Sequence, residues 1–425
     1  MFKRLKKFLT SIGPGIISGA SDDDPSGIAT YSQSGAQFGF GQLWTALYML
    51  PFLISVQEAC ARIGAVTGHG ISSALKRHYS KRILIIMVIA VLVANTINIG
   101  ADIGAMAASL ELVTPIAFLP LTIIITASIL ILEIFTSYRV YSRVLKWLAF
   151  SLLAYPLTLF IITAPWNTIF PATLIPHFEF SLPFFLLLTA ILGTTISPYL
   201  FFWQSSEEVE EERARKMIKF GLPHLTARFV RNLRFDTIIG MLFSELGTWS
   251  IIIVAATVLH NAGVTNINTA ADAAAALEPL VAGFPNAGYL AKLIFSLGVV
   301  GLGLLAIPVL AGSAAYALSE AVGFRDGLNL KFKQAHGFYL TMTIATLIGL
   351  LMNYIGIDPM KTLVYSAVLN GFVAVPLIFL IGKISSDKKI MGKYRSGFLS
   401  RSFIWLTFLA MAFAACGTIY MLVVG

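Results

Sequence analysis

Long apolar segments recur along the whole chain of 425 residues, and they limit the kinds of structure it can form. Hydrophobic residues make up 57% of the sequence and charged residues only 12%, with a mean hydropathy of +0.81. A helix needs about 20 apolar residues to cross a bilayer, and lipid admits only helices and closed barrels as spanning structures. We therefore expect an all-α integral membrane protein with eleven transmembrane helices. The expected helix cores are residues 12–35, 40–63, 83–107, 118–137, 144–163, 184–205, 237–259, 287–318, 336–355, 362–382 and 402–423.

The positive charge of the chain is concentrated in alternate connectors between these segments. The sequence carries 30 Lys and Arg against 21 Asp and Glu, a net charge of +9. Because cytoplasmic loops carry the excess of Lys and Arg, the pattern predicts a cell membrane, such as a bacterial inner membrane, with the N-terminus in the cytoplasm and the C-terminus outside. It gives no reason to expect a nucleic-acid partner. The basic clusters are residues 3–7, 76–82, 139–146, 213–234, 325–333 and 383–401, while Lys292 and Lys361 fall outside the pattern.

Three consecutive acids, Asp22, Asp23 and Asp24, lie inside the first apolar segment. A carboxylate at membrane depth costs about 2.5–3.5 kcal/mol on insertion scales. Pro25 lacks a backbone N–H and Gly27 tolerates non-helical dihedral angles, so the helix is expected to break here. A broken helix that carries acids is tolerated in a membrane only where it lines a protein cavity. The simplest use of such a cavity is to hold a cation.

The sixth segment contains a second unusual stretch, from Gly193 through Thr194 to Tyr199, with Pro198 in mid-span. A simple proline kink would explain it taken alone. However, interrupted segments at matching places in two halves of a chain indicate an inverted-repeat transporter with its site near the midplane. We therefore expect one transporter domain over residues 1–425. Its first five-helix repeat covers residues 12–163, its second covers 184–382, and residues 402–423 form an extra helix.

Other polar residues within the apolar segments have more than one interpretation. Asn98 and Asp102 fall on one stripe of the third helix, so Asp102 serves either permeation or pairing with a neighbouring helix. Asn370 in the tenth helix either offers an oxygen to the cavity or makes a structural hydrogen bond. Glu58 and Arg62, spaced i,i+4, form either a structural ion pair or an inner gate. The connector over residues 207–236 is expected to be solvated.

Four sequence motifs together resemble those of the NRAMP divalent-metal transporters. Within that family, the chain is most similar to the NRAMP-related magnesium transporter (NRMT) clade. The resemblance implies a LeuT-type fold of two inverted five-helix repeats, with alternating access. The motifs are Gly13-Pro14-Gly15, Asp24-Pro25-Ser26-Gly27, Gln57-Glu58-x-x-Ala61-Arg62-Ile63-Gly64 and Ser197-Pro198-Tyr199.

The resemblance places the metal site at Asp24, Gly27, Thr194 and Ser197. Typical members carry Asp-Pro-Gly-Asn and Ala-x-x-Met-Pro-His at these breaks, so here Gly27 stands for the Asn, Thr194 for the Ala and Ser197 for the Met. The soft thioether donor has gone and oxygen donors remain, which suits Mg²⁺ or Mn²⁺. Mg²⁺ dehydrates reluctantly and keeps part of its water shell. The resemblance therefore implies a transporter, not an enzyme, with Mg²⁺ and Mn²⁺ as transported substrates and no resident cofactor.

The residues that would couple transport to protons also depart from the family pattern. The helix-six His positions correspond to Tyr199 and Gln204, neither of which titrates near neutral pH. We therefore expect transport that is not coupled to protons, with proton-coupled Mn²⁺ or Fe²⁺ uptake as the alternative. We also expect the protein to be a monomer. Asp22 and Asp23 are expected to shape a negative vestibule or to bond the unwound backbone. The remaining residues expected beside the site or along the pathway are Asn98, Asp102 and Asn370.

Overall fold

The computed structural model describes residues 18–19, 21–135, 153–219 and 222–424. The starts of the first and fifth expected helices lie outside the described residues. So do the basic clusters at residues 3–7 and 139–146 and the motif Gly13-Pro14-Gly15.

The regular secondary structure of the described chain is helical apart from one short antiparallel hairpin, β1 (Ile218–Lys219) paired with β2 (Leu222–Pro223). Within the described ranges, eight helical stretches are long and apolar enough to cross a membrane. The eleven-helix count stays a prediction, because the other apolar helices in these ranges are shorter. The eight stretches are α4 (Trp44–Thr67), α6 (Lys81–Glu111), α7 (Phe118–Phe135), α11 (Leu182–Thr195) with α12 (Pro198–Ala214), α13 (Ala227–Ala255) with η2 (Ala256–His260), α16 (Ala287–Val322), α18 (Pro359–Ser386) and α20 (Phe398–Val424). The shorter helices are α3 (Pro25–Phe38), α9 (Ala154–Leu159) and α17 (His336–Met352).

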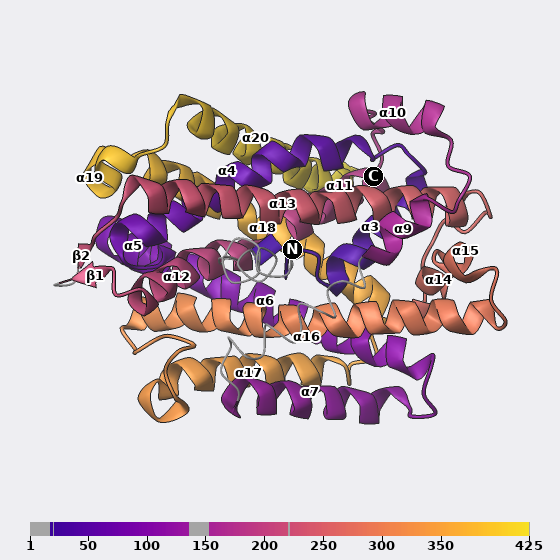
Figure 1. Cartoon of the computed structure of the whole chain (residues 1–425), viewed down its shortest axis with the longest axis horizontal. Coiled ribbons are helices and arrows are strands. Elements are labelled where there is room, and N and C mark those ends of the chain that lie inside the picture. The colour runs from indigo at the N-terminus through magenta and orange to yellow at the C-terminus, as the bar shows by residue number, and fades with distance from the viewer. Residues whose placement is uncertain (1–17, 20, 136–152, 220–221, 425) are drawn as a thin grey trace, which may run out of the picture.

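The connectors gather at the two ends of the long helices (Figure 1). One end carries α5 (Ile71–His78), the β1–β2 hairpin, α19 (Lys388–Met391) and η4 (Gly392–Tyr394). The other end carries α10 (Trp166–Leu174), α14 (Ala270–Ala275) and α15 (Glu278–Val281). The basic clusters at residues 76–82, 213–234 and 383–401 therefore belong to the same end of the molecule. We call it the basic end.

The connector expected to be solvated over residues 207–236 is largely helical, which corrects that prediction. Helix α12 continues to Ala214 and α13 already begins at Ala227. Glu208, Glu210 and Glu212 are buried. At least Glu210 has partners, because it accepts hydrogen bonds from Tyr316 of α16 and from Asn329.

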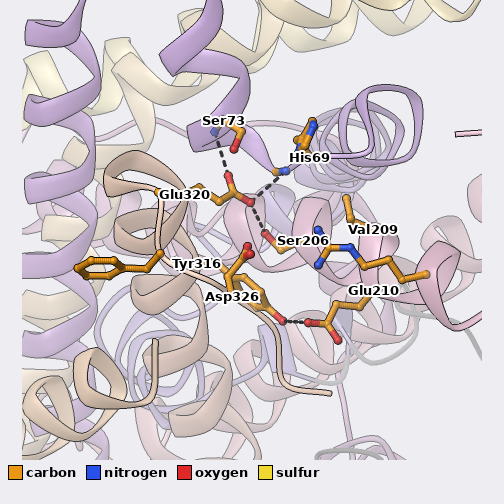
Figure 2. Close-up of a pocket in the computed structure, with 12 residues that line it drawn as sticks. His69, Ser73, Ser206, Val209, Glu210, Tyr316, Glu320 and Asp326 are labelled. Carbon is orange, nitrogen blue, oxygen red and sulfur yellow. Dashed lines mark hydrogen bonds between the residues drawn. The ribbon is translucent and has the colours of Figure 1, made fainter. Parts of the chain in front are cut away.

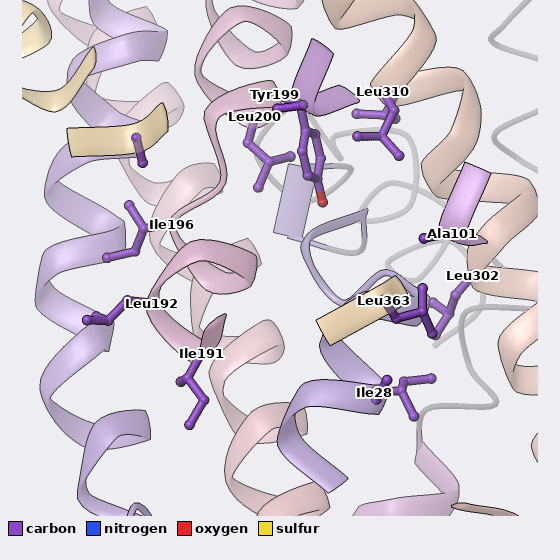
Figure 3. Packing of buried hydrophobic residues seen from close by; sticks show 14 of the residues in the cluster. Ile28, Ala101, Ile191, Leu192, Ile196, Tyr199, Leu200, Leu302, Leu310 and Leu363 are labelled. Carbon is purple, nitrogen blue, oxygen red and sulfur yellow. The ribbon is translucent and has the colours of Figure 1, made fainter. Parts of the chain in front are cut away.

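Helix α3 lies in the middle of the bundle, packed against α13, α18 and α11. Ile28 of α3 belongs to one hydrophobic core with Ala101 of α6, Leu302 of α16 and Leu363 of α18 (Figure 3). Close helix approach is built into the sequence: a Cβ added to Gly193 of α11 would lie 2.3 Å from the backbone nitrogen of Gly371 in α18. Only glycine fits at that crossing.

Two proline-led helix starts interrupt the central helices. Residues 21–22 are helical, Asp23 lies in a bend, and α3 begins at Pro25. Helix α11 ends at Thr195, Ser197 is extended, and α12 begins at Pro198. Both prolines occupy the first helical turn, where the missing N–H leaves no hydrogen bond unmade. The two interruptions therefore place non-helical backbone and short polar side chains in the middle of the bundle.

Candidate metal-binding site

Asp24 is the N-cap of α3, and this role fixes the position of its carboxylate. Oδ1 accepts a hydrogen bond from the backbone N–H of Gly27 (2.9 Å) and another from the Ser26 hydroxyl (2.5 Å). The free N–H groups and the dipole at a helix N-terminus stabilise such a negative charge. Asp24 is only 1% exposed. A single carboxylate is thus held at the start of a central helix, away from solvent.

The second carboxylate oxygen of Asp24 faces α6 and α12. Asn98 Nδ2 of α6 donates to Asp24 Oδ2 at 2.9 Å, and Ser366 of α18 donates to Asn98 Oδ1 at 2.7 Å. The Tyr199 hydroxyl of α12 lies 3.4 Å from Asp24 Oδ2 and 3.0 Å from the carbonyl oxygen of Ser21. Side chains from α6 and α12 therefore meet at this carboxylate oxygen, and Ser366 of α18 sets the orientation of the Asn98 amide.

The structure brings three of the four predicted ligand residues together. Thr194 Oγ1 at the end of α11 lies 3.5 Å from Asp24 Oδ1 and 3.0 Å from Ser26 Oγ. Gly27 faces the same group, since an added Cβ would lie 3.5 Å from Thr194 Oγ1. The hydroxyl of Ser197 points elsewhere: it donates to the carbonyl oxygens of Gly193 and Thr194. The last carbonyls of a helix have no intrahelical partner, so they take up this hydroxyl.

The three acidic residues predicted near the site lie in two places: Asp22 and Asp23 face α13, whereas Asp102 belongs to α6. Asp22 and Asp23 turn towards α13, where the Ser244 hydroxyl lies 2.6 Å from Asp22 Oδ2 and 3.4 Å from Asp23 Oδ1. Asp102 of α6 is fully buried, and the negative charge of Asp24 acts on it. Neither oxygen of Asp102 has a hydrogen-bond partner among the described residues. Asp102 therefore lies beside the site without a neighbour that neutralises it there.

Gln204 and Asn370 do not contact Asp24. Gln204 accepts a hydrogen bond from Ser18 and donates to Glu208 Oε1 at 3.0 Å, so it belongs to a polar chain along α12. Asn370 is fully buried in α18, and its amide has no hydrogen-bond partner in the described part of the chain. The expected cavity oxygen of Asn370 thus stays a prediction.

Sequence reasoning missed Ser26, Ser244 and Ser366. Ser26 had a local signal, because it lies only two residues after Asp24, within reach of its carboxylate. Ser244 and Ser366 had none, since their partners lie 222 and 268 residues away in the chain. Only the packing of α13 and α18 against the centre reveals these contacts.

The donor set around Asp24 suits a hard cation. Its side-chain neighbours Ser26, Asn98, Thr194 and Tyr199 offer oxygen and nitrogen atoms and no sulfur. A hydroxyl can rotate from donating a hydrogen bond to presenting a lone pair, so the same groups can serve a bound ion. No group of three or more His, Cys, Asp or Glu side chains in the described ranges is arranged to hold a metal. An ion here would rely on one carboxylate, hydroxyl and carbonyl oxygens, and water.

A separate cavity of about 130 Å³ lies at the basic end (Figure 2). Glu320 of α16 accepts hydrogen bonds there from the backbone N–H groups of Gly70 (3.0 Å) and Ser73 (2.9 Å), at the start of α5. Burial and the positive charges of Arg77 and Arg213 lower the pKa of His69 on the cavity wall. The cavity shares no residue with the Asp24 site, and the Glu320 carboxylate fixes α5 to α16.

Comparisons with known proteins agree with this architecture. The family model described as Nramp, natural resistance-associated macrophage protein-like, matches residues 15–421. A divalent metal cation transporter, MntH, of Caldanaerobacter subterraneus subsp. tengcongensis is 26% identical over 401 residues, covering 93% of this chain and 89% of the relative.

Solved structures show the same fold. The Eremococcus coleocola manganese transporter superposes with a TM-score of 0.77 at 16% identity, covering 98% of this chain and 87% of that one. Mhp1, a nucleobase-cation-symport-1 family transporter, has a TM-score of 0.55 at 16% identity, covering 97% of this chain and 91% of that one. The family model spans nearly the whole sequence, and so the chain belongs to the Nramp family.

Proposed function

We propose that the chain is a secondary transporter that moves divalent metal cations across a membrane by alternating access. The observation that carries this proposal is the buried Asp24 carboxylate at the start of α3, with oxygen donors from α11 and α12 beside it. The named relatives are metal and manganese transporters, not enzymes, which supports the same function here. Because Asp24 is 1% exposed, an ion reaches it only after the surrounding helices move.

We propose Mg²⁺, together with Mn²⁺, as the transported ion. Mn²⁺ is the ion named for the structural relative. The case for Mg²⁺ rests on the groups around Asp24, which offer no thioether. Carboxylate, carbonyl and water ligands suit Mg²⁺, Ca²⁺ and Mn²⁺, and Mg²⁺ sites in proteins usually keep several waters and use one or two carboxylates. A partly hydrated ion beside Asp24 fits that pattern, with Gly27 and Thr194 lining the space.

We further propose that transport needs no proton gradient. By the sequence resemblance, Tyr199 and Gln204 correspond to the positions at which the family carries histidines, and neither side chain exchanges a proton near neutral pH. An inside-negative potential of 100 mV favours the uptake of a divalent ion by about 4.6 kcal/mol, twice the single-charge value. Proton-coupled Mn²⁺ or Fe²⁺ uptake is the second candidate. Asp102 favours it, because a buried carboxylate without a described partner is a natural proton carrier.

Ion influx and internal pH, followed together in one set of proteoliposomes, separate these two functions. We expect Mg²⁺ influx, reported by an enclosed dye, without acidification of the lumen. The influx should increase when a potassium diffusion potential makes the lumen negative. Mn²⁺ influx with acidification and no Mg²⁺ signal would instead establish the proton-coupled function.

The Ser197→Met variant tests the ligand-softness argument. A thioether at this position adds the donor that prefers softer metals, so we expect the flux ratio of Mn²⁺ or Cd²⁺ to Mg²⁺ to increase relative to wild type. Ser197→Ala is the matched control, because it also removes the hydroxyl bonded to the carbonyls of Gly193 and Thr194 but adds no sulfur. An identical ion ranking in both variants would refute the argument.

We also propose the two inverted five-helix repeats, a cytoplasmic N-terminus, and a monomer as the working unit. The interruptions before Pro25 and Pro198 support the repeats, since they occur in the first helix of each expected half. The gathering of Lys- and Arg-rich connectors at one end of the molecule supports the orientation, because such connectors face the cytoplasm.

A further inference from the structure

A second acidic group lies between the chain before Asp24 and helix α13. Ser244 of α13 places its hydroxyl 2.6 Å from Asp22 Oδ2 and 3.4 Å from Asp23 Oδ1. Glu245 follows Ser244 in the same helix; its negative charge acts on Asp22, and the charge of Asp23 acts on Glu245. Three carboxylates therefore face one small region, which we call the α13 acidic cluster: Asp22, Asp23 and Glu245, with Ser244.

These carboxylates are buried, and several of their oxygens lack partners. Asp22 is 0% exposed, Asp23 2% and Glu245 5%. Asp22 Oδ1 and both carboxylate oxygens of Glu245 have no hydrogen-bond partner among the described residues. The ion pairs found in the described ranges involve none of the three acids. Buried charges are normally paired or bind a metal, so these carboxylates need a positively charged ligand whenever they are ionised.

The position of the cluster is fixed by close backbone packing. A Cβ added to Gly19 would lie 2.3 Å from the carbonyl oxygen of Gly240, and one added to Gly247 would lie 3.1 Å from Asp23 Oδ2. Gly240, Ser244 and Gly247 share one face of α13 by their spacing. Larger residues at the two glycines would push the acidic segment away from that face, so the sequence keeps it there.

The contacts also show on which side of Asp24 the cluster lies. From Gly19 to Asp23 the chain meets α13 in order, Gly19 at Gly240 and Asp23 at Gly247, so the two segments run parallel. The cluster is therefore displaced from Asp24 towards the start of α13. That start follows the β1–β2 hairpin at the basic end.

We propose that the α13 acidic cluster is a second binding station for a hydrated divalent cation, distinct from the Asp24 site and on its basic-end side. This inference rests on the proposed transport function, since the transported ion is the one that occupies the station. Since no three acids in the described structure are arranged to ligate a metal directly, the ion keeps water between itself and part of the cluster, as Mg²⁺ commonly does. With the basic end in the cytoplasm, as proposed above, an incoming ion reaches this station after leaving Asp24. Two adjacent sites of moderate strength allow an ion to be bound and still released.

Mn²⁺ binding to purified full-length protein tests the station, with free Mn²⁺ followed by electron paramagnetic resonance. Asp24→Asn removes the charge of the first site, and we expect this variant still to bind one Mn²⁺, which Mg²⁺ displaces. Adding Glu245→Gln should weaken that binding by roughly ten- to a hundredfold, the usual cost of losing an outer-shell partner of a metal. Glu133→Gln is the matched control: Glu133 of α7 is also a buried glutamate without a described partner, and α7 packs on α6, α16 and α17 instead.

The station is refuted if Asp24→Asn binds no Mn²⁺, or if Glu245→Gln and Glu133→Gln affect its binding equally. Size-exclusion elution and Tm identify a variant that fails to fold, and Asp23→Asn then replaces Glu245→Gln with the same expected loss. Wild-type Mn²⁺ and Mg²⁺ flux is measured in parallel. Absence of both fluxes would overturn the proposed transport function, whereas normal flux with no second binding site would overturn the station alone.

Discussion

Replacing Asp24 by alanine is expected to abolish divalent-metal transport and to leave a folded membrane protein. The carboxylate is the one charged group that the donors from α3, α6 and α12 share. Loss of an outer-shell partner already costs about 10–100-fold in metal affinity. If Asp24 is the carboxylate that holds the ion, as proposed, its loss should therefore reduce Mg²⁺ and Mn²⁺ flux at least about a hundredfold. Dye-reported influx into proteoliposomes, normalised to the amount of reconstituted protein, measures the effect.

The Asp24→Asn variant separates the charge of this residue from its role as a helix cap. Asparagine is as good an N-cap as aspartate, whereas alanine loses about 0.5–2 kcal/mol of stability at such a position. We expect both variants to lose transport and Asp24→Asn to keep a Tm closer to wild type, since its amide oxygen still accepts the Gly27 N–H. Wild-type flux in Asp24→Asn would show that transport does not require the negative charge of this residue.

The helix starts at prolines and the positions of the long apolar helices could be predicted from the sequence. Pro25 and Pro198 lack an N–H wherever they stand, and both open a helix in the structure. Apolar segments of bilayer length marked the long helices, although α12 and α13 extend well beyond their expected ends. Local pattern cannot fix those ends, because buried partners such as Tyr316 for Glu210 decide how far a polar helix persists.

The site itself was predictable only where a residue is tied to a break. Asp24, Gly27 and Thr194 lie together because each sits at an interrupted helix end. The direction of the Ser197 hydroxyl depends on which carbonyls are free at the end of α11, and the turn of Asp22 and Asp23 towards Ser244 depends on the register of α13. Such rotamers and registers follow from tertiary packing, which a single sequence does not specify.

The buried ion pair of α4 gives the largest expected change in stability. Arg62 donates to both carboxylate oxygens of Glu58, at 2.9 and 2.8 Å, and its side chain is 1% exposed. It also donates to the Ser396 hydroxyl (3.0 Å) and to the carbonyl oxygen of Tyr394, while Arg234 of α13 donates to Glu58 Oε1 at 2.8 Å. The predicted i,i+4 pair is therefore confirmed. It joins α4 to α13 and to the segment that precedes α20.

Arg62→Ala should lower the free energy of unfolding by about 3–5 kcal/mol, because it leaves a buried carboxylate without its main partner. Arg215→Ala is the matched control: Arg215 and Glu211 form a pair of the same spacing, but their side chains are 50% and 28% exposed. Exposed helix pairs contribute only about 0.3–0.5 kcal/mol, so its Tm should stay near wild type. Equal Tm losses in the two variants would show that burial does not determine how much the ion pair contributes to stability.

Transport per folded molecule decides between the two roles left open for Glu58 and Arg62. A structural pair leaves that rate unchanged in Arg62→Ala, whereas an inner gate changes it, because opening at the basic end would no longer require the Glu58–Arg62 contact to break.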